Sequence, residues 1–554
     1  METTKKTTFV KGAAILAAVG LVCKFIGVLF RIFAGRIVGE PGMNYYELVY
    51  PTYSWLLIIS SSGIPTAISR MVAERAAVGN YDGARRVFRR SLLLLLLIGA
   101  VTSALMFFGA EWIATAVLGS DVGAKYSMMA LAPALLFVSL MCAYRGYLQG
   151  LQRMTGTSVS QLTEQIIKFV SGLLLAYVLF RKYQGSPWCY AAGAAGLLIG
   201  VTVSEALSLL VMMVFYWRTK GQYKALIADP NPHEKVVGPV LAIAIPITLG
   251  ASILPIANVL DSAMITRLLK TIGEPFTAIV ANVDKPDFTF ADLNYQALCT
   301  YVRSVINLPA TLTIGIAMSI VPAISAARVK NDHEGVKQLS LLSLKIAMAV
   351  GLPCAVGLSV LAGPIIKLLY NYIRPDSLEI ATRLMHVAAF TVVFISLVQT
   401  ATGALQGVGK HRLPVWFLLI GGITKVIVNL ICIPIPKINI LGAVFSNLAC
   451  FGIAGILDTV VLLRVTEAKL NAIDTFLKPA FASAIMGAGA WSIHRLLSRI
   501  PLLQTGRMSA IATVLAILLA VVIYAVMTLA LGMFTREELA YIPGGRKLAR
   551  FARR

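Results

Sequence analysis

The chain has 554 residues, of which 58% are hydrophobic and only 13% are charged. Because soluble proteins carry about 25% charged residues, this composition excludes a soluble multi-domain enzyme and a disordered chain. The charges are unbalanced, with 49 Lys and Arg against 25 Asp and Glu, a formal net charge of +24. In a soluble protein this excess would suggest nucleic acid. Here it indicates a multi-span membrane protein with basic cytoplasmic loops and no nucleic-acid partner.

Fourteen segments are long and apolar enough to cross a bilayer, which takes about 20 residues. We therefore expect an all-α polytopic membrane protein with about 14 transmembrane helices. The first segment is interrupted by Lys24 and Arg31 and precedes no A-x-A site, which favours an uncleaved span over a signal peptide. The segments lie near residues 9–39, 44–69, 90–110, 124–148, 158–181, 189–217, 236–269, 296–327, 339–363, 380–407, 413–434, 439–463, 475–498 and 508–534.

Basic residues concentrate in the even-numbered loops and in the C-terminal tail. The positive-inside rule therefore predicts that both termini are cytoplasmic, as an even number of spans requires. The loop after the thirteenth segment contradicts this pattern, because it carries Arg495, Arg499 and Arg507. The last helical hairpin is the weakest part of the predicted topology.

The sequence repeats itself at one fixed offset. The sequence FVSL at 137–140 recurs as FISL at 394–397, LQG at 148–150 recurs at 405–407, and PTAIS at 65–69 resembles PAIS at 322–325. Lys168 likewise recurs as Lys425, and in every pair the first residues are 257 positions apart. Each repeat holds six spans, so the two copies have the same orientation.

This repeat predicts the domain organisation. We expect two parallel six-helix lobes, residues 1–235 and 236–470, followed by a C-terminal helix pair and a basic cytoplasmic tail in residues 471–554. Transporters commonly bind their substrate between such lobes.

Charged residues inside spans need a reason, because each costs about 2.5–3.5 kcal/mol on insertion scales. Lys24 and Arg31 are seven residues apart and share one helical face with Gly20 and Gly27. We expect them to form a cationic wall of a central cavity, with Arg303 in the eighth span as a third cation. In the alternative interpretation, Lys24 pairs with a neighbouring acid and Arg31 extends to the outer interface.

The seventh span carries Asn258 and Asp261 at positions i and i+3. Asp261 is predicted either to pair with a cavity cation, to bind a coupling ion, or to form a purely structural ion pair. The coupling ion would be Na+ or H+, and the membrane potential is a further energy source.

A polar stripe runs along the fifth span through Gln161, Glu164, Gln165 and Lys168. Glu164 and Lys168 are spaced to pair along the helix, so the stripe is interpreted as stabilising the lobe. Lys425 in the second copy suggests the same structural role there.

Glu205 and Asp458 are interpreted as similar buried partners. Pro65 and Pro322 lie in spans two and eight and are candidate hinges, although many membrane helices contain prolines without such a role.

Motifs for a cofactor or for enzymatic chemistry are missing. There is no G-x-x-x-x-G-K-[ST], no H-E-x-x-H, no Ser/His/Asp elbow motif, and none of the seven cysteines forms a C-x-x-C pair. The sequence therefore predicts no metal site, no cofactor, no ATPase activity of its own and no enzyme.

Several sequence motifs resemble those of a known family. The sequences RGYLQG at 145–150 and SQLTEQ at 160–165 are similar to the signature R-G-Y-x-Q-G…S-Q-x-x-E-Q of stage V sporulation protein B and its relatives. GIPTAIS at 63–69 and VPAIS at 321–325 share this resemblance, which covers nearly the whole chain. The family is the polysaccharide-transporter branch of the MOP exporters and includes the MurJ-like lipid II flippases.

The resemblance implies fourteen helices, alternating access, a bacterial plasma-membrane location and a lipid-linked peptidoglycan precursor as substrate. Family flippases use cavity arginines on helices 1, 2 and 8. Arg31 and Arg303 match two of these, Lys24 replaces another basic position, and the helix 2 arginine has no match. The C-terminal helix pair resembles the groove that holds the polyprenyl tail in the family.

We therefore expect a monomeric flippase for a polyprenyl-pyrophosphate-linked oligosaccharide of the lipid II type. Its other partners would be membrane lipids and proteins of cell-wall synthesis or sporulation. Four alternatives stay open: a flippase for a sporulation, capsule or teichuronic-type unit, a drug/cation antiporter, an enzyme acting on polyprenyl-linked sugars, and a non-transporting scaffold.

Overall fold

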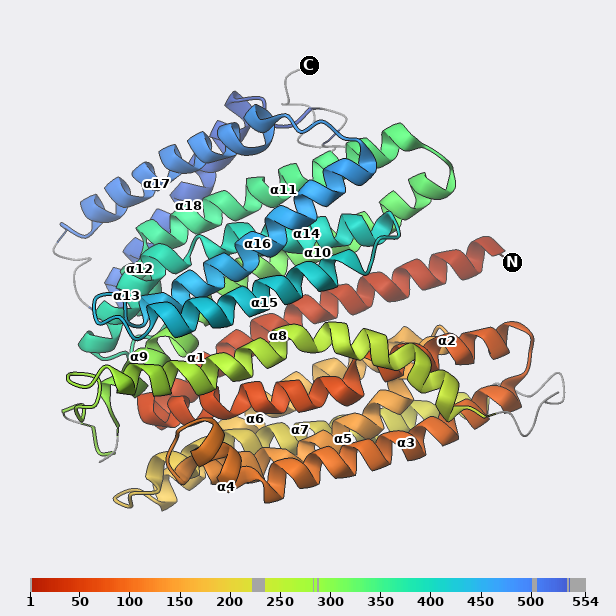
Figure 1. The fold of residues 1–554 in the computed structure, drawn as a ribbon, viewed down its shortest axis with the longest axis horizontal. Helices are drawn as coiled ribbons and strands as arrows, with labels where there is room; N and C mark the ends of the chain where they lie inside the picture. The colour runs from red at the N-terminus through yellow and green to blue at the C-terminus, as the bar shows by residue number, and fades with distance from the viewer. Residues whose placement is uncertain are drawn as a thin grey trace. The chain divides into compact units, whose positions relative to one another are not determined.

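The computed structural model describes residues 2–221, 235–281, 283–285, 288–500, 506–535 and 538. The chain divides into two compact units, Met1–Gln296 and Ala297–Arg554. Each unit is a bundle of long helices (Figure 1).

The first unit contains nine α-helices and one π-helical turn in its described residues. They are α1 (Glu2–Ser61), α2 (Gly63–Ala77), α3 (Tyr81–Phe108), α4 (Ala110–Trp112), the π-helical turn Ile113–Val117, α5 (Gly123–Gly150), α6 (Met154–Lys182), α7 (Cys189–Lys220), α8 (Val237–Thr271) and α9 (Phe290–Gln296).

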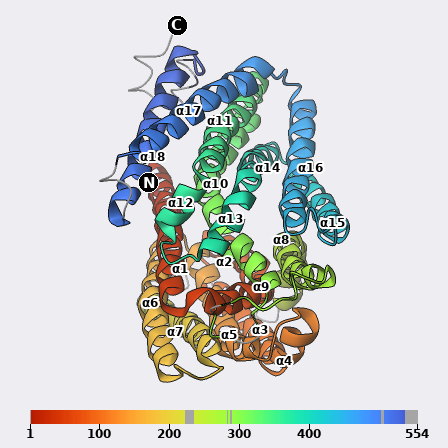
Figure 2. The same ribbon diagram turned by 90° about the vertical axis from the view of Figure 1, so that its left-hand side faces the viewer.

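The second unit contains nine further α-helices and two π-helical turns within the described part of the chain. They are the π-helical turn Ala297–Val302, α10 (Arg303–Val329), α11 (His333–Val360), α12 (Ala362–Leu369), α13 (Pro375–Ala388), α14 (Thr391–Gly407), α15 (Leu413–Cys432), α16 (Leu441–Thr466), the π-helical turn Ile473–Leu477, α17 (Lys478–Leu497) and α18 (Gly506–Ala530). The last two helices lie side by side, and α17 also packs against α11 (Figure 2).

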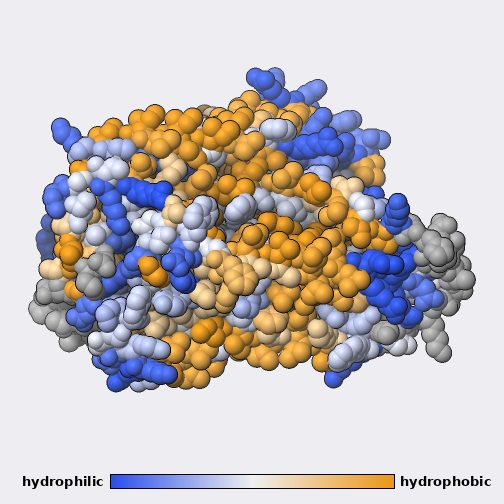
Figure 3. All heavy atoms as spheres, turned by 60° about the horizontal axis from the view of Figure 1, so that its bottom comes forward, coloured by the Kyte–Doolittle hydropathy of each residue, from blue (hydrophilic) through white to orange (hydrophobic). Residues whose placement is uncertain are grey.

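The predicted all-α membrane fold is confirmed. Among the described residues, ten helices are long and apolar enough to cross a membrane, or eleven if the bent pair α13 and α14 is one span. Helices also occupy the predicted first, second and thirteenth spans, but they are not among these ten or eleven. The predicted count of fourteen spans is therefore approximate. Apolar side chains cover much of the face seen in Figure 3, and hydrophilic side chains gather toward its two ends.

A sharp kink divides α1 into two arms. At Gly39 the backbone has φ 64° and ψ −175°, which is not helical, and Pro41 follows two residues later. Glycine tolerates a positive φ because it has no Cβ, and proline at the start of the second arm costs no helical hydrogen bond. The kink separates the predicted spans 9–39 and 44–69.

A second interruption separates α1 from α2 at Ser62, three residues before Pro65. Pro65 has no N–H, so it cannot donate to the carbonyl of Ser61 one turn earlier. Gly63 approaches α8 so closely that a Cβ there would collide with the carbonyl of Ala244. In contrast, α10 runs through Pro322 without a break. The two copies of the proline motif therefore differ in backbone conformation, and the hinge roles of both prolines stay predictions.

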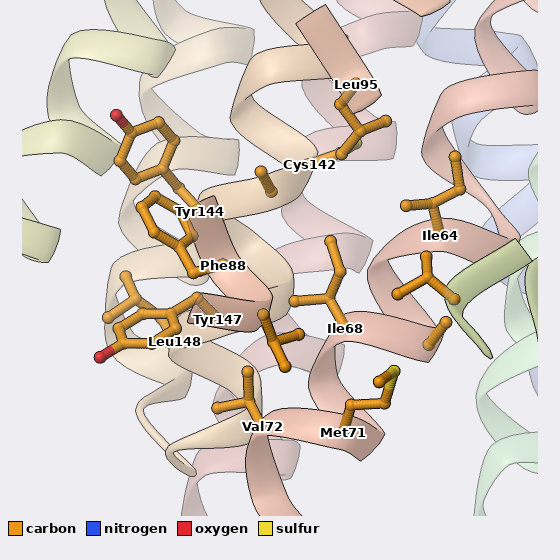
Figure 4. Packing of buried hydrophobic residues seen from close by; sticks show 14 of the residues in the cluster. Ile64, Ile68, Met71, Val72, Phe88, Leu95, Cys142, Tyr144, Tyr147 and Leu148 are labelled. Atoms are coloured by element: carbon orange, nitrogen blue, oxygen red, sulfur yellow. The ribbon is translucent and has the colours of Figure 1, made fainter. Parts of the chain in front are cut away.

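The core of the first unit is aromatic and aliphatic (Figure 4). Phe88 of α3 stacks on Tyr216 of α7 with ring centroids 4.6 Å apart, and it also contacts Tyr144 and Tyr147 of α5. Such ring pairs add about 0.5–1.5 kcal/mol to the effect of burial itself. The cluster fixes the positions of α3, α5 and α7.

The same helix pairings recur in both units, as the sequence repeat predicts. Helix α5 packs against α2, α3 and α7, and α6 packs against α7. In the second unit, α14 packs against α10, α11 and α16, and α15 packs against α16.

Helix α8 is the exception to this symmetry. By sequence it begins the second repeat, but it packs against α1 and α2 and so falls in the first compact unit. The predicted lobe boundaries at 235 and 470 were placed from the sequence repeat, whereas the two compact units are defined by helix packing and divide after Gln296.

Candidate functional site

The predicted cation Arg31 is paired within its own helix. Its Nη2 lies 3.4 Å from Oε1 of Glu47 on the second arm of α1. The Arg31 side chain is 22% exposed, whereas that of Glu47 is 7% exposed. The pair joins the two arms beyond the Gly39 kink, so Arg31 balances a buried carboxylate while its own side chain stays partly accessible.

Lys24 has a different environment. It lies two turns earlier on the first arm of α1, its side chain is exposed, and it forms no ion pair within the described residues. A Cβ at Gly20 or at Gly27 would have no atom within 4 Å, so the surface beside Lys24 is open. The alternative in which Lys24 pairs with a neighbouring acid finds no support in the described residues.

The carboxylate in the polar stripe of α6 pairs with a cation of α5. Arg145 Nη2 lies 3.2 Å from Oε2 of Glu164, and Arg145 also donates to Oγ of Ser160. The spacing of Glu164 and Lys168 in the sequence predicted a pair along the helix. The structure instead gives its ion pair to Arg145, whose guanidinium reaches across from the neighbouring helix and contacts two acceptors at once.

Lys168 is surrounded by aromatic rings of α1. Its Nζ lies 5.1 Å from the ring centre of Phe30 and 5.4 Å from that of Tyr50. Ammonium groups at this distance are attracted by the negative ring face. Tyr46 and Tyr53 extend this aromatic face at positions i and i+7, a spacing that is visible in the sequence, although neither was among the predicted site residues.

Asp261 and Asn258 lie on α8, inside the first unit. Asp261 is 2% exposed, and the carbonyl of Asn258 accepts a hydrogen bond from Ser262. Ser262 in turn accepts from the hydroxyl of Tyr295, which lies 3.2 Å from the Glu47 carbonyl. The second arm of α1, α8 and α9 therefore meet next to the Arg31–Glu47 pair, and Asp261 lies beside this network.

Arg303 and Lys425 belong to the second unit. Arg303 begins α10 directly after a π-helical turn and is half-buried, a geometry often found at functional positions. Lys425 of α15 is 3% exposed. Their predicted roles, in the cavity and in the fold respectively, stay predictions.

A further polar cluster in the first unit was not predicted from the sequence. Lys285, in the connection from α8 to α9, lies 3.1 Å from Oδ2 of Asp121, and the hydroxyl of Tyr45 donates to the same oxygen at 2.7 Å. The Lys285 ammonium also lies over the Tyr45 ring, 4.4 Å from its centre. In the sequence, Asp121 and Lys285 are separated by four predicted spans, so their spacing could not identify them as neighbours.

The described residues contain no group of three or more His, Cys, Asp or Glu side chains able to hold a metal ion. The polar groups reported above are cations, carboxylates, amides and hydroxyls. Of these groups, the cations and hydroxyls are the kinds that form charge-assisted hydrogen bonds with anionic, hydroxyl-rich ligands.

Family models match most of the chain. The model of polysaccharide biosynthesis proteins matches residues 9–273, and the MatE model matches residues 297–431. The chain is thus a multi-span membrane protein that is similar to polysaccharide biosynthesis proteins over residues 9–273 and to MatE proteins over residues 297–431.

Relatives of the chain support this class. From Bacillus subtilis (strain 168), the uncharacterized membrane protein YabM is 27% identical over 98% of this chain and 96% of its own length. Lipid II flippase MurJ is 24% identical over 77% of each chain, and stage V sporulation protein B is 23% identical over 84% of this chain and 86% of its own.

A solved structure shares the fold. The inward closed conformation of lipid II flippase MurJ aligns with a TM-score of 0.67 at 16% identity, over 93% of this chain and 98% of that chain. The expected relationship to MurJ and stage V sporulation protein B is confirmed.

Proposed function

We propose that this protein is a flippase for a lipid-linked cell-wall precursor. By alternating access it would move an undecaprenyl-pyrophosphate-linked, lipid II-like unit from the inner to the outer leaflet of the plasma membrane. The observation that carries the proposal is Lys24, an exposed cation on an apolar helix two turns before Arg31 that makes no ion pair with any described residue.

The chemistry of such a substrate explains why an exposed cation is useful there. Each unpaired polar group of a sugar headgroup costs roughly 2–7 kcal/mol to transfer into hydrocarbon, and a pyrophosphate costs more. An ammonium group without a protein partner offers three donors to a phosphate. Arg31 adds a second cation, already oriented by Glu47. We assign substrate contact to these two residues and, in the second unit, to Arg303.

The relatives favour this substrate class. One of them is named a lipid II flippase and another a sporulation protein. A flippase for another polyprenyl-linked polysaccharide unit is the second candidate, favoured by the missing arginine in the second span. That stretch reads SWLLII at 54–59.

Complementation of a flippase-depleted strain tests the proposal, with outer-leaflet accumulation of lipid II as the readout. The wild-type chain should restore growth and surface lipid II. Lys24→Ala should abolish both at unchanged protein level, whereas Lys24→Arg should retain them. If wild type restores neither, the substrate is not lipid II. If Lys24→Ala behaves like wild type, the cation proposal is wrong.

A further inference from the structure

The two repeats differ in whether a cation lies next to a buried carboxylate. Arg145 on α5 and Thr402 on α14 are equivalent positions, because 402 − 145 = 257, the offset of the repeat. Arg145 supplies a fixed cation to the first unit and pairs with Glu164. Thr402 has no charge, and its hydroxyl donates to Oδ2 of Asp458 at 2.7 Å.

The carboxylates themselves occupy corresponding helices. The repeat equivalent of Glu205 on α7 is Leu462 on α16, since 205 + 257 = 462. Asp458 lies four residues before Leu462, one turn away on the same side of α16. Glu205 is close enough to Arg145 and Lys168 to interact with both cations electrostatically. Asp458 has no such compensation from the α14 position.

Asp458 is enclosed and only half satisfied. Its side chain is 1% exposed, and Oδ1 has no hydrogen-bond partner among the described residues. A buried ionised carboxylate without a cation is far more costly than a neutral one, because its lost hydration is not replaced.

The helices packed against α16 do not supply that cation. They are α11, α13, α14 and α15, and α14 carries no charged residue. Within the described residues, no basic side chain lies in ion-pair range of Asp458. The charged and imidazole groups on α16 and these neighbours are Arg464, Lys425, His333, Glu334, Lys337, Lys345, Asp376, Glu379, Arg383 and His386.

Several of these groups are engaged elsewhere. The Lys345 ammonium lies 2.7 Å from Glu538, and the His386 ring is bonded to the Ser359 carbonyl. Lys425 is buried and makes interactions of its own.

We propose that Asp458 is a binding site for an exchangeable monovalent cation, and that this cation is a proton held on Oδ1. In the first unit, Arg145 neutralises buried acid permanently. In the second unit, Thr402 supplies no positive charge, so the Asp458 carboxylate must be neutralised by an ion that can dissociate. One carboxylate and one hydroxyl provide few oxygen ligands for a metal ion, which favours the proton. The proposal goes beyond the flippase function and does not depend on which substrate is carried.

Infrared difference spectroscopy of the purified full-length protein in lipid bilayers at pH 7 tests this site. A protonated carboxylic acid has a C=O stretching band that a carboxylate lacks. Wild type and Thr402→Ser should show this band, and Asp458→Asn should lose it. Thr402→Arg should also lose it although Asp458 is still present, because the introduced guanidinium copies Arg145 and keeps the carboxylate ionised.

The control is Asp474→Asn. This partly exposed carboxylate pairs with Lys478 at 2.5 Å, and its removal should leave the band unchanged. Gel-filtration elution and circular dichroism confirm that each variant folds.

Persistence of the wild-type band in folded Asp458→Asn would overturn the proposal. So would absence of the band from wild type. If the band is absent and Na+ raises the thermal midpoint of wild type but not of Asp458→Asn, the proton is wrong and the site binds sodium.

Discussion

Arg31 and Glu47 form an ion pair between the two arms of α1, with Nη2 and Oε1 3.4 Å apart. The pair gives Arg31 two possible tasks, since it neutralises a nearly buried carboxylate and presents a partly exposed guanidinium. A loss of function in Arg31→Ala alone therefore does not distinguish substrate binding from folding.

A double variant separates these tasks. Arg31→Ala should reduce the amount of folded protein, because the buried carboxylate of Glu47 loses the cation that lies 3.4 Å from it. Arg31→Ala/Glu47→Gln should restore the thermal midpoint but not complementation of a flippase-depleted strain. Glu47→Gln alone is the control, and it should keep measurable transport because Arg31 is still present. Transport by the double variant would show that Arg31 has only a structural role.

Lys24→Ala is expected to leave stability unchanged. Its side chain is exposed and makes no ion pair in the described part of the chain, so its removal leaves no group unsatisfied. The thermal midpoint should match that of wild type within error, while surface lipid II falls to the level of the empty vector. A lower midpoint would mean that Lys24 supports the fold.

The Arg145–Glu164 pair should be structural. Glu164→Gln weakens a charged hydrogen-bond network between α5 and α6, and the expected cost is about 1.5–3 kcal/mol of unfolding free energy. Gln165→Ala on the same stripe is the control and should cost less, because its neutral side chain makes no ion pair and, among the described residues, donates only to Glu164. Chemical denaturation in detergent measures both, and equal effects would contradict the assignment.

Gly63→Ala tests the close approach of α2 and α8. The added Cβ would collide with the backbone carbonyl of Ala244, so folded protein should fall sharply. Gly238→Ala on α8 is the matched control, because a Cβ there meets no atom within 4 Å. Fluorescence-detected gel filtration reports the folded fraction, and normal yield of Gly63→Ala would show that the two helices separate easily.

Much of the fold could be predicted from the sequence because apolar length and a fixed repeat offset are local signals. The contacts between charged side chains could not be predicted in this way. Glu47 lies beyond the Gly39 kink from Arg31, and Arg145 reaches Glu164 from another helix, so neither pairing has a sequence spacing that identifies it. Lys285 and Asp121 are separated by four long helices. Lys24 was identifiable because a lone charge in an apolar segment is conspicuous without knowledge of its neighbours.

Helix α8 belongs to the second repeat by sequence but to the first unit by packing, and this matters for where the chain can be divided into two fragments. A chain cut after residue 235 would separate α8 from α1 and α2, against which it packs. Its fragments would therefore expose complementary apolar surfaces and should be recovered only when produced together. A cut in the connection between α8 and α9 would leave α8 with both partners. A protein split in the connection between α8 and α9, with a reporter half fused to each fragment, should consequently accumulate better than one split after residue 235.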